Sequence, residues 1–167
     1  MSQVYYSSFR SPVGELLLVG DETGLQQLRF AGESRTIGKD WLRRHELFRD
    51  LREQLRAYFA GELQRFSVQL APQGSAFQQQ VWEALLGIPY GETSSYAGLA
   101  EKIGRPAAVR ALGGACGRNP IPIIIPCHRV IGSSGGLTGF SGGIGIKQQL
   151  LTLEQLHRPF ELIAQPG

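Results

Sequence analysis

The sequence is short of the residues that build metal sites and disulfides: its 167 residues include two cysteines, three histidines and one methionine. Cys116 and Cys127 form no CxxC pair and the histidines show no ligand spacing, which argues against zinc. We interpret Cys116 as a small buried core residue rather than half of a disulfide. The N-terminus has no secretory pattern and no apolar run could span a bilayer, so we expect a cytoplasmic protein without a membrane segment.

Charge is modest overall but unevenly placed. The formal net charge is +3, and 42% hydrophobic residues are typical of an ordered globular chain. Between residues 93 and 130 five basic residues face one acid, Glu101. The five are Lys102, Arg105, Arg110, Arg118 and Arg129. This local excess favours an anionic partner.

The first half reads as a small scaffold. Residues 3–30 alternate apolar and polar positions around two turns, which predicts an antiparallel meander. A helical stripe containing Leu47 and Tyr58 ends at Gly61, and residues 66–70 suit a short strand. We therefore predict a scaffold domain over residues 1–72.

The second half, residues 73–167, is predicted to be mostly helical. Apolar stripes indicate a helix from Phe77 to Pro89 and others over the ranges 94–103, 106–117 and 144–156. The two middle helices, joined through Gly104, suggest a helix-turn-helix. The fold class is thus α/β in the α+β sense, a small antiparallel sheet with a helix followed by a helical domain with an active-site strand or loop.

The helix predicted over 106–117 has unusually small side chains. Ala111, Gly113 and Gly114 leave much of its surface as backbone, with Arg110 projecting from it. Such smallness serves close packing in a core, or lets a basic helix enter a narrow groove of DNA. The sequence leaves both interpretations open.

Reactive chemistry is concentrated in Pro126-Cys127-His128-Arg129-Val130. A thiol becomes a nucleophile as thiolate, and His128 and Arg129 could supply the base and the positive charge. Residues 121–126 read as a buried strand ending at the cysteine, so adjacent Cys127 and His128 would need a water or a turned backbone to communicate. The alternative is an inert core cysteine.

Glycines crowd the segment after the cysteine. Residues 132–145 contain seven glycines but match no phosphate-binding pattern, which argues against nucleoside triphosphates. Such a loop could close over a flat ligand. In the last helix, periodicity places Glu154 on the solvated side.

Several of these motifs together resemble one family, the O6-alkylguanine-DNA alkyltransferases of the stand-alone bacterial type. The resemblance is strong from about Phe77 to His157 and loose in the first half. It rests on Tyr96, Arg110-Ala111-Leu112-Gly113-Gly114, Asn119-Pro120, Pro126-Cys127-His128-Arg129-Val130 and Ser141-Gly142-Gly143.

The resemblance implies a chemistry. Cys127 would attack the alkyl carbon on O6 of guanine, activated through a water, His128 and Glu154. Tyr96 would donate a proton to the leaving base and Ser141 a hydrogen bond to O6. In this arrangement Asn119 would brace the turn before the nucleophile.

The resemblance also implies contacts with base and DNA. The backbone carbonyls of Cys127 and Val130 would line the guanine pocket with Phe140 and Gly142. Arg110 would enter the base stack as the nucleotide rotates out. The residues Ala111, Gly113, Gly114 and Arg105 would contact the minor groove or phosphates.

Alkylation of sulfur leaves a thioether, so each molecule should act once. We also expect the protein to act as a monomer and to need neither a cofactor nor a metal. Acceptance of O4-methylthymine and cooperativity on DNA stay open. Phe140 stands where some members have tyrosine, and no cysteine-rich segment that could hold zinc or support a transcriptional role precedes Cys116. Competing readings are a lesion sensor, which would lack the cysteine, a helix-turn-helix regulator and a thiol hydrolase that turns over.

Overall fold

The computed structural model describes residues 2–33, 36–132, 140 and 142–158. Its first half is a sheet with strand order β3-β2-β1-β4, made of β1 (Tyr5–Ser11), β2 (Gly14–Asp21), β3 (Gly24–Arg29) and β4 (Leu42–Arg43). The first three strands are antiparallel, which confirms the predicted meander, and β4 runs parallel to β1. β2 is an interior strand of the sheet, and its residues Leu16 to Val19 are all buried.

One helix covers this sheet. After a 3-10 turn, η1 (His45–Phe48), helix α1 (Arg49–Phe59) buries Leu51, Leu55 and Tyr58. The chain then turns at Gly61 with a φ of 77°, a conformation that glycine adopts without strain. The prediction of a strand over 66–70 is wrong. Only Leu70 forms a β-bridge to the sheet, at Leu25, and residues 66–69 belong to no strand.

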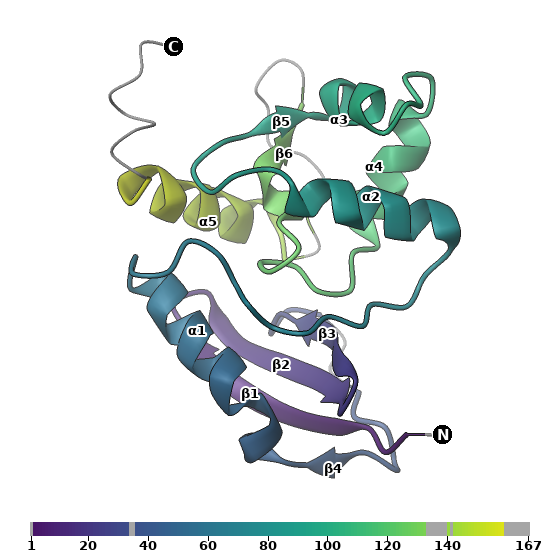
Figure 1. Cartoon of the computed structure of the whole chain (residues 1–167). Helices are drawn as coiled ribbons and strands as arrows, with labels where there is room; N and C mark the ends of the chain where they lie inside the picture. Colours follow the sequence, from purple (N-terminus) through teal and green to yellow (C-terminus); the bar gives the residue numbers. More distant parts are fainter. Residues whose placement is uncertain (1, 34–35, 133–139, 141, 159–167) are drawn as a thin grey trace.

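The second half is helical, as predicted (Figure 1). It contains α2 (Ala76–Leu86), β5 (Ser94–Ser95), α3 (Tyr96–Lys102), α4 (Val109–Gly117), η2 (Cys127–Arg129), β6 (Val130–Ile131) and α5 (Ile144–Leu156). Helix α2 starts with a capping box between Ser75 and Gln78. Gly104, with a φ of 76°, forms the turn before α4, which begins later than predicted because Ala108 still closes a turn on Arg105.

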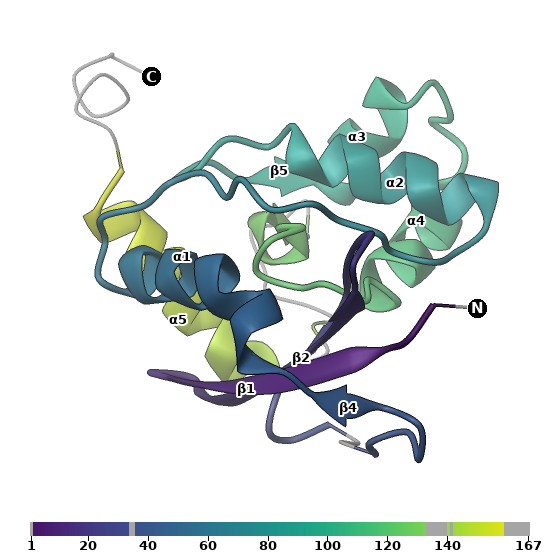
Figure 2. The ribbon, with the colours of Figure 1, turned by 60° about the horizontal axis from the view of Figure 1, so that its bottom comes forward.

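The two halves share one apolar core. Residues from β2, α1, α2, α4 and α5 belong to a single buried cluster. The Leu28 amide donates to the Pro120 carbonyl at 2.8 Å, which ties β3 to the segment after α4. Helix α5 lies beside α1 in both views (Figures 1 and 2). This contact places the end of α1 close to the segment that follows Pro126.

The segment 121–126 corrects a prediction, because it is a turn rather than a strand. Ile123 has a φ of 76°, which is rare for a β-branched residue, and the Ile125 amide donates back to the Ile121 carbonyl at 2.9 Å. Its apolar side chains are buried, as a core strand would require. Prolines 120, 122 and 126 lack the amide protons that a strand ladder needs.

Candidate active site

Cys127 opens the short 3-10 turn η2, and its amide donates to the Ile125 carbonyl at 2.8 Å. It is only 7% exposed, while His128 is fully buried. The turned backbone replaces the extended geometry that we predicted, in which neighbouring side chains would have pointed to opposite faces. A ligand reaching Cys127 must therefore enter the protein.

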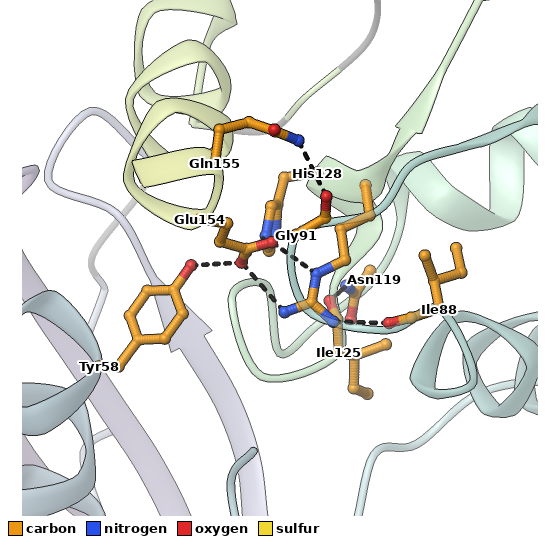
Figure 3. Close-up of polar contacts among 9 residues, drawn as sticks. Tyr58, Ile88, Gly91, Asn119, Ile125, His128, Glu154 and Gln155 are labelled. Atoms are coloured by element: carbon orange, nitrogen blue, oxygen red, sulfur yellow. Dashed lines mark hydrogen bonds and ion pairs between the residues drawn. The ribbon is translucent and has the colours of Figure 1, made fainter. Parts of the chain in front are cut away.

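Asn119 holds the turn before Cys127 with two hydrogen bonds, of which Figure 3 shows the partner Ile125. Its side-chain amide nitrogen donates to the Ile125 carbonyl at 2.8 Å, and its oxygen accepts from the Ile121 amide at 2.9 Å. Both bonds are buried. One side chain thus closes the loop at both ends and fixes the backbone that leads into Cys127.

Glu154 of α5 is bound to His128. Its Oε2 lies 2.7 Å from His128 Nε2, and Glu154 is 1% exposed, so the solvated position inferred from periodicity is wrong. Burial raises the pKa of Glu154, but hydrogen bonds from His128 and then Arg129 outweigh it and bring the pKa to about 2. Because an ionised carboxylate can only accept, the proton lies on Nε2.

The other ring nitrogen of His128 has a different environment. Within the described part of the chain, the buried Nδ1 atom has no hydrogen-bond partner. In the neutral ring this atom holds the lone pair. Burial lowers the pKa of His128, against the opposing effect of Glu154, so the ring is neutral at physiological pH and its basic nitrogen is free to accept a proton.

Arg129 does not serve the thiol as predicted. Its Nε donates to Glu154 Oε1 at 2.8 Å, its Nη2 to Oε2 at 3.0 Å, and its Nη1 to the Ile88 carbonyl at 2.7 Å. The guanidinium is committed to the carboxylate because the 3-10 turn directs both His128 and Arg129 toward α5. Its charge therefore balances Glu154.

The cation that does act on the cysteine is Lys147, which sequence reasoning missed. Lys147 of α5 is fully buried and donates from Nζ to the Val130 carbonyl at 2.7 Å. Burial raises the pKa of Cys127 to about 11, although the Asn119 amide and the Lys147 charge oppose this rise. The resting cysteine is therefore a thiol, which would need a base to act as a nucleophile.

Two further predicted residues flank the turn. Strand β5 pairs in parallel with β6, Ser94 with Val130 and Ser95 with Ile131, so half-buried Tyr96 follows directly beside the post-cysteine segment. The Val130 carbonyl, predicted to line the guanine pocket, accepts from Lys147 Nζ. Ser141 lies outside the described residues.

Phe140 and Gly142 adjoin the first half of the chain. The Phe140 ring lies 5.5 Å from that of Phe30, centroid to centroid. A Cβ at Gly142 would come within 2.8 Å of the Phe30 ring, so this position has no room for a larger residue. Phe30 belongs to the N-terminal half, which therefore forms one wall beside the predicted pocket.

The predicted DNA-contacting residues lie apart from this buried site, on α4. Leu112, Ala115 and Cys116 face the core. Arg110, Ala111 and Gly114 are exposed, and Gly113 is half-buried. A Cβ on Gly113 would meet no heavy atom within 4 Å beyond its neighbours and its own helix backbone, and one on Gly114 only Arg118, at 3.7 Å. Intramolecular packing therefore does not explain these glycines.

Arg105 lies before α4 and is exposed, with its guanidinium 5.5 Å from the Phe77 ring centroid. Across the described residues no three His, Cys, Asp or Glu side chains are placed to share a metal ion. Nor is any described helix long and apolar enough to cross a membrane.

Comparison with known proteins matches both halves of the chain. Residues 4–72 match the 6-O-methylguanine DNA methyltransferase ribonuclease-like domain, and residues 76–156 the DNA binding domain of the same name. A methylated-DNA–protein-cysteine methyltransferase of Methanosarcina acetivorans is 52% identical, covering 90% of this chain and 98% of the relative. The chain belongs to the 6-O-methylguanine DNA methyltransferase family. This finding confirms the resemblance read from the motifs.

Solved structures of the family agree in fold as well. The Mycobacterium tuberculosis O6-methylguanine methyltransferase superposes with a TM-score of 0.87 at 49% identity, covering 96% of this chain and 98% of that one. The same organism's OGT in complex with DNA gives 0.87 at 50% identity over 95% and 97%. The fold class predicted from the sequence is confirmed.

Proposed function

We propose that this methyltransferase repairs DNA by moving the alkyl group from O6 of a modified guanine onto Cys127, once per molecule. The observation that supports it most is the unpartnered, buried Nδ1 of His128, the residue that follows the buried thiol of Cys127, with Nε2 held on Glu154. That is the arrangement of a nucleophile, a base and a group that orients the base.

The proposed transfer begins with removal of the proton from the Cys127 thiol. The Cys127 proton passes through a water to His128 Nδ1, and the resulting imidazolium is stabilised by Glu154. Sγ forms a bond to the alkyl carbon as the bond from that carbon to O6 breaks. Guanine leaves as an anion and takes a proton, for which Tyr96 is the proposed donor, with Ser141 donating to O6. The thioether that remains accounts for a single turnover.

Access to the thiol requires the base to leave the helix. Because Cys127 is 7% exposed, a guanine stacked in a duplex cannot approach Sγ. The exposed small face of α4 offers close approach to a minor groove, and Arg110 projects from that face. We assign Arg110 to the gap left by the rotated nucleotide, and Ala111, Gly113, Gly114 and Arg105 to the surrounding DNA contacts.

The mass of the protein tests the reaction directly. Mixed with a duplex containing one O6-methylguanine, the wild-type chain is expected to gain one methyl group, confined to the peptide containing Cys127. The gain should stop at one per molecule. Binding without a mass gain would indicate a lesion sensor, and release of more than one product per protein molecule would indicate a hydrolase.

Arg110→Ala is expected to slow repair of duplex DNA by about 10-fold or more while leaving reaction with free O6-benzylguanine within about twofold, since only duplex needs a base rotated out. Single-turnover rates on both substrates provide the measurement. Lys102→Ala is the control for loss of one exposed charge on the neighbouring helix α3. Equal losses on the two substrates would remove Arg110 from this role.

We further propose a cytoplasmic location. A reducing compartment keeps Cys127 as the free thiol that the reaction needs. Both cysteines are free in the structure.

A further inference from the structure

Tyr58 connects the first half of the chain to the site. It lies near the end of α1 and is fully buried, and its hydroxyl donates to Glu154 Oε2 at 2.6 Å (Figure 3). The bond joins residues 96 positions apart, from the two segments that match different family domains. A buried phenol normally finds a partner, but this partner is the carboxylate that holds the proposed base.

The carboxylate of Glu154 receives four hydrogen bonds. Oε1 accepts from Arg129 Nε, and Oε2 accepts from His128 Nε2, Arg129 Nη2 and Tyr58. Three of the four bonds meet at Oε2, which makes this oxygen the point where the histidine, the arginine and the tyrosine converge. Arg129 and His128 both belong to η2, and Tyr58 is the donor that approaches from another element. Its bond to Oε2 adds a restraint on the carboxylate from outside η2, beside the two bonds from Arg129.

The ring position of Tyr58 is itself well determined. Its ring packs against those of Phe59, Phe66 and Tyr90, with centroids 5.2, 5.4 and 6.2 Å away. Tyr90 is also buried, yet its hydroxyl has no hydrogen-bond partner among the described residues. Of these two neighbouring buried tyrosines, only Tyr58 has a hydroxyl bonded to Glu154, while the Tyr90 ring lies 5.7 Å from the Arg129 guanidinium, a contact that phenylalanine would keep.

Relying on the proposed function, we propose that Tyr58 is a positioning residue for alkyl transfer: its hydroxyl holds the Glu154 carboxylate in the orientation that accepts from His128 Nε2 and so leaves Nδ1 as the basic nitrogen. The first half of the chain is then more than the scaffold that its sequence suggested. It supplies one of the donors on which the geometry of the base depends.

The charged groups around His128 set its pKa, so the role of Tyr58 should be visible in the pH dependence of the reaction. Glu154 raises the pKa of the histidine, while Arg129 of η2 and Lys147 of α5 lower it. Tyr58 of α1 and Tyr90, in the loop after α2, are neutral, since burial raises the pKa of both phenols. The Tyr58 hydroxyl disperses negative charge on Oε2. Its loss leaves a stronger acceptor for Nε2, and the pKa of His128 rises.

The test compares Tyr58→Phe with Tyr90→Phe in the full chain. Single-turnover methyl transfer from an O6-methylguanine duplex is measured from pH 5 to 9, together with the melting temperature. Tyr58→Phe is expected to slow transfer about 10-fold at the plateau, the lower end of what loss of a supporting hydrogen bond costs an active site. The fall in its transfer rate at low pH, which we call the acid limb of the pH profile, should begin at a higher pH than in the wild type. Tyr90→Phe should match wild type in both.

Each outcome either supports or overturns the positioning role of Tyr58. A Tyr58→Phe profile that matches Tyr90→Phe, or a slower rate with an unmoved acid limb, overturns the positioning role, since a purely structural defect would leave the limb in place. Wild-type protein that transfers no methyl group overturns the proposed function together with this role. Normal wild-type transfer beside an unaffected Tyr58→Phe overturns the role of Tyr58 alone.

A measurement on the unmodified chain covers the case in which Tyr58→Phe does not fold. The Tyr58 hydroxyl proton is expected to exchange slowly with solvent in proton NMR, and its shift should change as His128 titrates. A hydroxyl proton that exchanges at the solvent rate, or that ignores this titration, overturns the proposal.

Discussion

Replacement of Cys127 by serine is expected to reduce methyl transfer by at least about 10³-fold, because a hydroxyl in the same position is a far poorer nucleophile than a thiolate. Affinity for duplex DNA should stay within about twofold, since the face of α4 proposed to bind DNA is separate from the turn η2. Rapid-quench transfer assays and fluorescence anisotropy measure the two quantities.

The control for that result is Cys116→Ala. Cys116 is also buried, and burial raises its pKa to about 12, so it is a second buried thiol that stands outside the Pro126-Cys127-His128 motif. This variant should retain transfer. Methylation of the Cys127→Ser chain, or loss of transfer in folded Cys116→Ala protein, would contradict the assignment of the acceptor.

Glu154→Ala should be among the most destabilising single substitutions, with a loss of about 3–5 kcal/mol in the free energy of unfolding. It would leave the Arg129 guanidinium, 7% exposed, without its counter-ion, and Tyr58 and His128 without an acceptor. Urea unfolding gives the measurement. The matched control is Glu53→Ala, whose partner Arg56 is exposed, and its unfolding midpoint should hardly change.

Acid unfolding offers an independent check with a defined sign. The folded-state pKa of Glu154 is lowered to about 2, against about 4.3 in an unfolded chain. Its contribution to stability is therefore complete above about pH 4.3 and is lost as pH falls toward 2. The stability gap between wild type and Glu154→Gln should narrow over this range. A gap that stays constant would show that folding does not lower the pKa of Glu154.

Local patterns predicted those parts of the fold that local forces determine. The meander over 3–30, helix α1 and the bounds of α5 follow from alternating or helical apolar spacing, and all were confirmed. The segment 121–126 was mispredicted, because apolar composition alone does not separate a buried strand from a buried turn. The bonds from Asn119 that close this turn depend on side-chain geometry.

The site was predicted in part. Cys127 and His128 stand in a recognisable motif, but Tyr58 and Lys147 have no local signal. Tyr58 continues an apolar helical stripe and reads as core, while Lys147 reads as an ordinary surface cation on an amphipathic helix. Their roles come from the contacts that α5 makes with α1 and with Val130 after η2, which bring together residues far apart in the sequence.

The raised pKa of Cys127 has a consequence for the protein between encounters with damage. With a pKa of about 11, roughly one molecule in ten thousand holds the sulfur as thiolate at neutral pH. Peroxides and stray electrophiles react with thiolates, so the sulfur resists oxidation and adventitious alkylation while it waits. A protein that can react only once therefore stays unmodified until it meets its substrate, because the reactive thiolate forms only during the reaction.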